Sequence, residues 1–172
     1  MSIGVIEVTD DQAPAPNSWL CDICGQRIPD PGVGMVIFRD SSERPMHDFK
    51  IVHKTIDPWR CWDRAEADGF RADEELYSCI GADGLTNLLS WLSWGPVDAA
   101  IQGRHRSHVA TEDLDDYVDL VRRLQIPYYE EARRRFRDQE VYEELVGVNP
   151  VYPYTQDRLR WAASRPHPDA LS

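Results

Sequence analysis

The sequence lacks the features of a membrane or secreted protein. No stretch of its 172 residues approaches the roughly 18 uninterrupted apolar residues of a membrane-spanning helix. The first sixteen residues have no basic start and no long apolar run, so no signal peptide is predicted. They end in alternating alanine and proline, which is typical of a flexible lead-in. We therefore expect a cytoplasmic protein without membrane contact.

Basic residues are also scarce. The chain has 19 Lys and Arg against 30 Asp and Glu, a net charge of −11. A domain that binds duplex nucleic acid mainly through the phosphate backbone usually has the opposite balance. The charge therefore disfavours nucleic acid as a partner, although it leaves that interpretation open.

The familiar catalytic motifs are missing. The sequence contains no P-loop, no G-x-G-x-x-G, no H-E-x-x-H and no G-x-S-x-G. His105 and His108, with Glu112 and Asp113 nearby, form one further cluster of groups that could support chemistry. We predict no catalytic residue and no organic cofactor, and we keep a metal-dependent enzyme that uses the His105/His108 loop as an alternative.

What is present is enough apolar surface for a folded core. Hydrophobic residues make up 42% of the chain, including six Trp and seven Tyr. We predict an α+β fold, in which a zinc-stapled β-hairpin unit packs on a mainly α-helical C-terminal half. The predicted regions are a flexible segment at 1–16, a zinc-binding unit at 17–70, a helical domain at 71–148, and an extended Pro/Tyr segment with a short helix and tail at 149–172.

In the zinc-binding unit, residues 33–40 and 49–54 are rich in β-branched and aromatic side chains. They flank a polar turn, which predicts a β-hairpin. Asp57 and Pro58 are typical of the N-cap and first position of a helix, and Gly69 is typical of the residue that ends one. We therefore expect a helix over 58–68.

The second half reads as a series of helices. Asp73 can cap a short helix that runs through Cys79. Apolar residues at helical spacing predict the longer helices. The first of these ends at 95–96, and one of its faces carries Leu85, Leu88, Leu89 and Leu92. The next helix opens at Thr111, and its expected buried face consists of Leu114, Tyr117, Val118, Val121 and Leu124. Two more helices are expected, over 128–146 and from Thr155 through Trp161.

Two cysteines predict a metal site. Cys21 and Cys24 are three residues apart and Gly25 follows them, as in a zinc knuckle. The glycine permits the positive φ that turns backbone N–H groups toward the sulfurs. Four cysteines in a cytoplasmic protein favour metal or free thiols over disulfides. We expect one structural zinc ion per chain.

A knuckle, a hairpin and a final ligand in the first turn of a helix together resemble the treble-clef or zinc-ribbon-like zinc-binding modules. The resemblance covers residues 19–70, and no family is recognised for the rest of the chain. It implies that His53 and Cys61 complete the ligand set. The spacing of His53 and Cys61 is wider than the usual close second pair. Cys79, or less readily His47, is the alternative to His53.

Aromatic and basic residues in the helical half suggest an interaction surface. Its expected members are Trp91, Trp94, Tyr128, Tyr129, Arg133, Arg134 and Arg137. We predict a non-enzymatic regulator or adaptor that acts through protein–protein contacts, with a protein partner or self-association. The alternative is a DNA-binding transcriptional regulator with a helix-turn-helix-like C-terminal half.

Overall fold

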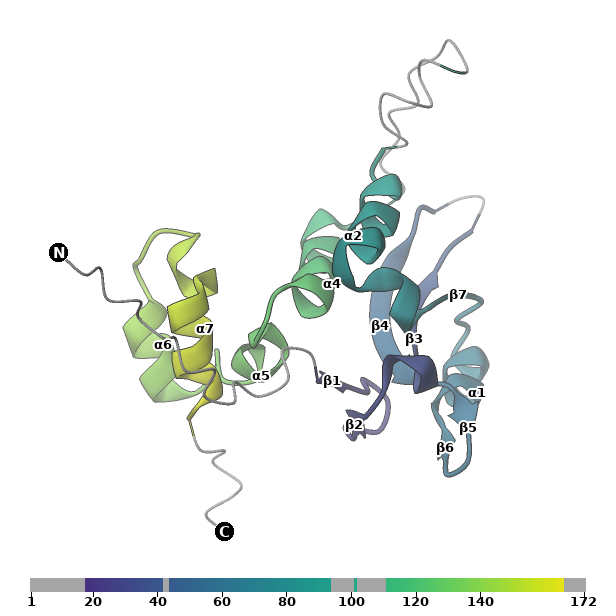
Figure 1. The fold of residues 1–172 in the computed structure, drawn as a ribbon, viewed down its shortest axis with the longest axis horizontal. Helices are drawn as coiled ribbons and strands as arrows, with labels where there is room; N and C mark the ends of the chain where they lie inside the picture. The colour runs from purple at the N-terminus through teal and green to yellow at the C-terminus, as the bar shows by residue number, and fades with distance from the viewer. Residues whose placement is uncertain (1–17, 42–43, 94–100, 102–110, 166–172) are drawn as a thin grey trace, which may run out of the picture.

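The structure is a computed structural model, and it describes residues 18–41, 44–93, 101 and 111–165. It confirms the α+β class. Figure 1 shows the strands and α1 on one side, α5, α6 and α7 on the other, and α2 and α4 between them.

A three-stranded antiparallel sheet carries the largest core. Its strands are β3 (Gly34–Arg39), β4 (His47–His53) and β7 (Ala72–Glu75), in the order β4-β3-β7. The predicted hairpin is confirmed as β3 and β4, with Gly34 opposite His53. The helix that we expected after Asp73 is wrong in its first half, because Asp73 lies in β7 and pairs with Ile37 of β3. Only the second half is helical, as the 3-10 turn η2 (Leu76–Cys79).

Two short hairpins flank the sheet. β1 (Trp19–Leu20) pairs with β2 (Arg27–Ile28), and β5 (Thr55–Ile56) pairs with β6 (Trp59–Arg60). Helix α1 (Cys61–Ala67) follows β6 directly. It starts three residues after the predicted position because Trp59 and Arg60 pair with β5 instead of forming the first turn. The short turn η1 (Pro31–Val33) leads into β3.

Further helices in the described residues include α2 (Gly81–Ser90), α4 (Leu114–Gln125), α5 (Tyr129–Arg133), α6 (Gln139–Leu145) and α7 (Gln156–Ala163), with the 3-10 turn η3 (Tyr152–Tyr154) before α7. Asp113, not Thr111, caps α4, since its carboxylate accepts the N–H groups of Asp115 and Asp116. Thr111 instead forms a β-bridge with Met46. The start of the last helix after Thr155 is confirmed.

The single helix expected over 128–146 is wrong. The chain forms α5 and α6 with a turn between them. In that turn the ring of Phe136 packs against Tyr129 and Tyr154, at centroid separations of 6.1 and 6.3 Å. The break in the helix therefore turns an aromatic side chain inward.

The buried apolar residues form two clusters. The larger contains the sheet, α1, α2 and α4, and it ends along the chain at Leu124. The smaller begins at Tyr128 and joins α5, α6 and α7. The predicted face of α4 is buried at Tyr117 and Leu124, whereas Leu114 is exposed. The connection between α4 and α5 is therefore also the boundary between the two clusters.

Candidate metal centre

The Cys21–Cys24 segment forms the tight turn that its spacing predicts. It connects β1 to β2. A hydrogen bond from the N–H of Cys21 to the carbonyl of Gln26, 2.9 Å long, closes the turn. The N–H of Gly25 donates to the carbonyl of Cys21 at 2.8 Å, and Gly25 has a φ of 72°. Glycine adopts that left-handed conformation without strain, so the turn holds both sulfurs on one side.

His53 and Cys61 reach the same place from different elements. His53 is the last residue of β4 and is fully buried, and Cys61 is the first residue of α1. The knuckle lies against β4, because the N–H of Asp22 donates to the carbonyl of Ile51 at 2.8 Å. Strand pairing therefore brings the imidazole next to thiols that are about thirty residues away in the sequence.

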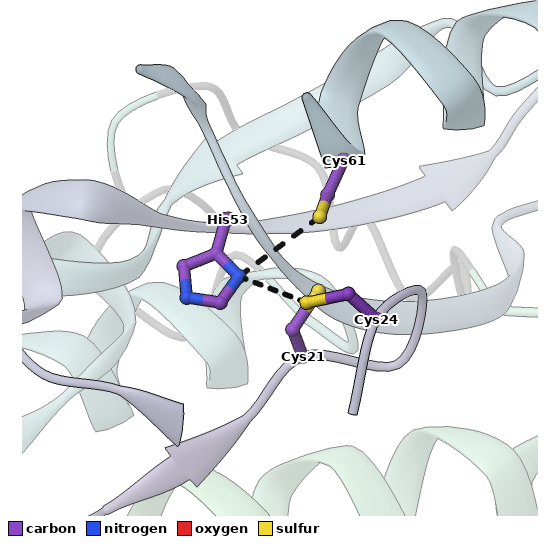
Figure 2. A group of neighbouring side chains, drawn as sticks. All are labelled: Cys21, Cys24, His53 and Cys61. Carbon is purple, nitrogen blue, oxygen red and sulfur yellow. Dashed lines mark hydrogen bonds between the residues drawn. The ribbon is translucent and has the colours of Figure 1, made fainter. Parts of the chain in front are cut away.

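The four ligand atoms lie within 4.8 Å of one another. The Nδ1 of His53 is 3.5 Å from the sulfur of Cys24 and 3.9 Å from that of Cys61. Figure 2 shows the imidazole nitrogen directed at these sulfurs, with Cys21 beside Cys24. Sulfur and nitrogen donors on one tetrahedral zinc would be about 3.6 Å apart, given metal–ligand distances of about 2.3 and 2.0–2.1 Å. The donor set therefore fits a metal ion of that size.

The other side of the His53 ring is also held. Its Nε2 lies 3.2 Å from the carbonyl oxygen of Arg27, so the N–H is on Nε2 and the lone pair of Nδ1 faces the thiols. The ring of Trp59 stacks on the imidazole at 4.3 Å with an angle of 6° between the planes. The indole N–H of Trp59 in turn donates to Gln26 at 3.0 Å. These contacts select the tautomer that a metal ligand requires.

The electrostatics of the cluster favour a bound cation. Burial lowers the pKa of His53, so the imidazole is neutral near pH 7. Burial, followed by the neighbouring thiols of Cys21 and Cys24, raises the pKa of Cys61 to about 12. Three thiolates cannot form side by side in a buried site without a compensating positive charge, and a divalent metal ion supplies it.

The alternative ligands lie elsewhere. Cys79 is buried outside the group, 4.0 Å from the hydroxyl of Ser78. The Nδ1 of His47 faces the carbonyl of Pro45 at 2.8 Å and lies 3.8 Å from Glu112. The structure thus brings together Cys21, Cys24, His53 and Cys61, and it does not bring Cys79 or His47 to them.

The expected aromatic surface is not formed by the rings that we can place. Tyr128 and Tyr129 are 9% and 3% exposed and belong to the smaller core. Trp91 is partly buried and packs against the rings of Phe38 and Phe49. Some of the four expected rings were predicted to be exposed, and Tyr128 and Tyr129 are not among the exposed ones, because both pack in the smaller core with residues of α6 and α7. Trp94 lies outside the described residues, as do His105 and His108.

The basic residues of the expected surface differ among themselves. Arg133 pairs with Asp119 at 3.1 Å, and neighbouring Arg135 is 3.6 Å from Asp138. Arg134 and Arg137 are exposed. Carboxylates of the chain itself therefore pair with two of these arginines, Arg133 and Arg135.

A buried arginine near the site was not predicted from the sequence. Arg123 of α4 is 4% exposed, and its guanidinium contacts both Asp22 of the knuckle and Glu130 of α5. An arginine three residues after the buried Leu120 is a weak signal of burial, because a helical arginine is normally solvated. Its partners, moreover, are distant in sequence or across a break in the helix.

Among the residues that the structure describes, no helix is long and apolar enough to cross a membrane.

Comparison with known proteins places the chain in no family. No family model, no curated protein and no solved structure matches this sequence or fold.

Proposed function

We propose that the Cys21/Cys24/His53/Cys61 group holds one structural zinc ion, and that the chain is a non-enzymatic regulator or adaptor acting through protein–protein contacts. Three sulfur ligands and one imidazole are a donor set that zinc commonly takes in structural sites. The order of knuckle, hairpin and helix resembles the treble clef, which supports zinc as the metal.

The observation that carries the proposal is the closed shell of protein ligands. A catalytic zinc keeps three protein ligands and leaves a fourth position for water or substrate. Here four protein donor atoms lie within 4.8 Å of one another, and Cys21, His53 and Cys61 are at most 2% exposed. A metal bound there has no free position, so its role is to hold the knuckle, β4 and α1 together.

Cobalt substitution tests this directly. The full chain is loaded with Co²⁺ in place of its native metal, and the visible spectrum is recorded with and without added azide. We expect one metal per chain, the intense bands of a tetrahedral thiolate site, and no change on adding azide, because no coordination position is open. A spectrum that responds to azide would show an open site and overturn the structural role.

The matched control is His53→Ala. Removal of the imidazole opens one position without touching a thiolate, so azide or free imidazole should now change the cobalt spectrum. Purified protein with no bound metal, or a Cys21–Cys24 disulfide formed with full retention of the fold, would overturn the zinc assignment itself.

The protein-contact part of the proposal has separate support. In the part of the chain that the structure covers, large apolar side chains remain exposed in pairs four residues apart, Leu85 with Leu89 on α2, and Tyr142 of α6 with Val146 directly after that helix. The net charge of −11 disfavours a phosphate backbone as the partner. A mobility shift with duplex DNA at low salt should therefore show no complex. A shift that weakens steeply as salt rises would favour the DNA-binding alternative instead.

A further inference from the structure

The knuckle is tied to the C-terminal helices by one buried arginine. Arg123 lies in the last turn of α4 and is 4% exposed. Its Nη1 and Nη2 donate to the two carboxylate oxygens of Asp22 at 2.9 and 3.1 Å. Its Nε and Nη2 donate to the two oxygens of Glu130 at 2.8 and 2.9 Å. One guanidinium therefore joins two carboxylates from different parts of the fold, each through two hydrogen bonds.

Asp22 lies between two of the metal ligands, Cys21 and Cys24. Its carboxylate also accepts the N–H of Ile51 at 2.7 Å, and its own N–H donates to the carbonyl of Ile51. The position of this carboxylate therefore depends on the closed form of the knuckle. A metal ion that holds Cys21 and Cys24 on one side of the turn also holds Asp22 against Arg123.

Further contacts place the network at the boundary between the two cores. The indole N–H of Trp19 donates to the carbonyl of Arg123 at 3.2 Å, and the N–H of Leu20 lies 3.4 Å from Glu130. Figure 1 shows β1 between α5 and the strands of the sheet. The larger core ends at Leu124 and the smaller begins at Tyr128, so the network spans the junction.

We propose that occupancy of the metal centre is transmitted through Asp22 and Arg123 to Glu130, so that metal loss loosens the packing of α5, α6 and α7 on the rest of the chain. The proposal rests on the proposed function, because it needs a metal at the four ligands. A buried arginine that loses one of two carboxylates keeps its charge partner but is left with N–H donors that have no acceptor in a site shielded from water, and the surrounding elements then move to hydrate them. Contacts of Asp119 with Tyr129 and Arg133 do not involve the knuckle. They keep α5 near α4, so we infer loosening and not detachment.

The test uses the reciprocity of coupled equilibria. If metal binding strengthens the Arg123–Glu130 contact, a change at Glu130 must weaken metal binding by the same factor. Zinc affinity is measured on the full chain by competition with a chromophoric chelator, for the wild type and for Glu130→Gln. We expect the affinity of Glu130→Gln to fall about tenfold, although Glu130 is on a different element from all four ligands. Unchanged affinity would overturn the proposal.

A matched control separates coupling from general destabilisation. Val141 is 1% exposed in α6, in the same smaller core, and it is not part of the network. Val141→Ala should destabilise α5, α6 and α7 yet leave zinc affinity at the wild-type value. Equal losses of affinity in Val141→Ala and Glu130→Gln would overturn the proposed route.

Hydrogen exchange gives the second readout. Asp22→Asn removes the negative charge beside Arg123 but leaves every ligand in place. We expect zinc-loaded Asp22→Asn to exchange amides in residues 129–163 several-fold faster than the wild type, with α2 unchanged. Unchanged exchange in residues 129–163 of the zinc-loaded variant would overturn the proposal. A wild type that binds no zinc at all would instead show failure of the metal site.

Discussion

His53 is positioned by the protein itself, before any metal is considered. Strand pairing with Gly34 fixes its backbone, the carbonyl of Arg27 orients the Nε2 side, and Trp59 covers one face of the ring. Burial lowers its pKa, which keeps the imidazole in the neutral form that binds metals. The side chain therefore has one free lone pair, and that lone pair faces three thiols.

This arrangement predicts opposite outcomes for two histidines. His53→Ala removes a metal ligand and should weaken zinc binding by more than about 100-fold, since loss of a contact behind a ligand already costs 10–100-fold. His47→Ala should leave zinc affinity unchanged, because His47 contacts Pro45 and Glu112. Chelator competition measures both. Zinc lost from His47→Ala and retained by His53→Ala would refute the ligand assignment.

We expect the Cys79 thiol to make the stability of the fold depend on pH, and we expect it to have no part in metal binding. Burial raises its pKa to about 12, well above the ordinary thiol value of about 8.5. The unfolded chain therefore loses this proton first as the pH rises, so the folded state is destabilised by up to about 1.4 kcal/mol per pH unit between roughly pH 9 and 12. Below pH 8 the thiol is protonated in both states and the effect is absent.

The comparison that isolates this thiol is Cys79→Ala. Urea unfolding at pH 8 and pH 10 should show a smaller alkaline loss of stability in the variant than in the wild type. The variant should also keep one zinc per chain by elemental analysis. Loss of zinc from Cys79→Ala would restore the four-cysteine ligand set.

At the scale of single residues, sequence reasoning worked where spacing carries the chemistry. Cys21 and Cys24 follow from their separation and the glycine after them, and the resemblance supplied His53 and Cys61. Arg123 could not be predicted in the same way. Its burial depends on Asp22, about a hundred positions away, and local periodicity carries no information on such a partner.

At the scale of elements, the approach of η2 to β3 is set by a glycine. Gly34 is paired with His53, and a Cβ at this position would lie 2.6 Å from Cδ2 of Leu76 and 3.0 Å from Cγ2 of Ile28. Gly34→Ala should therefore lower the free energy of unfolding by about 1–3 kcal/mol, because added volume in a packed core forces its neighbours to move. Chemical denaturation of the zinc-loaded chain measures the change.

Gly25→Asn is the control for that substitution. A Cβ at Gly25 meets nothing within 4 Å, and asparagine tolerates its positive φ better than other residues do. We expect its stability to change by less than that of Gly34→Ala. An equal or larger loss at Gly25 would mean that backbone conformation, and not crowding, governs the fold around the knuckle.

The elements that sequence patterns predicted best are those with a single clear signal. β-Branched and aromatic residues on both sides of a polar turn identified the β3–β4 hairpin, and Thr155 identified the start of α7. The elements that were wrong depend on distant partners. Residues 72–75 form a strand because the free edge of β3 takes them as a partner. Helix α5 ends early because Phe136 packs against Tyr154 of η3 as well as against Tyr129 of α5.

At the scale of the whole molecule, two cores account for Trp91, Tyr128 and Tyr129, three of the four aromatic residues that had suggested a binding surface. Phe38, Phe49, Trp91 and Tyr117 pack together between the sheet and the helices. Tyr129 belongs to the smaller core, where its hydroxyl donates to Asp119. A chain of this length has room for many large rings once a second core forms, and composition alone does not reveal that second core.

A surface used by a partner is therefore expected to involve residues other than Tyr128 and Tyr129, and substitutions can separate exposed residues from core residues. Tyr129→Ala should lower stability by about 3–5 kcal/mol, as expected for an aromatic residue removed from a core. Leu89 is 53% exposed on α2, so Leu89→Ala should change stability by no more than about 0.5 kcal/mol. Melting temperature and association state are measured together for each variant. A clearly lower melting temperature for Leu89→Ala would mean that Leu89 is part of a core and is not free for a partner. Tyr129→Ala that melts like the wild type while changing association would return the interaction surface to α5, because only an exposed ring can be lost without loss of stability.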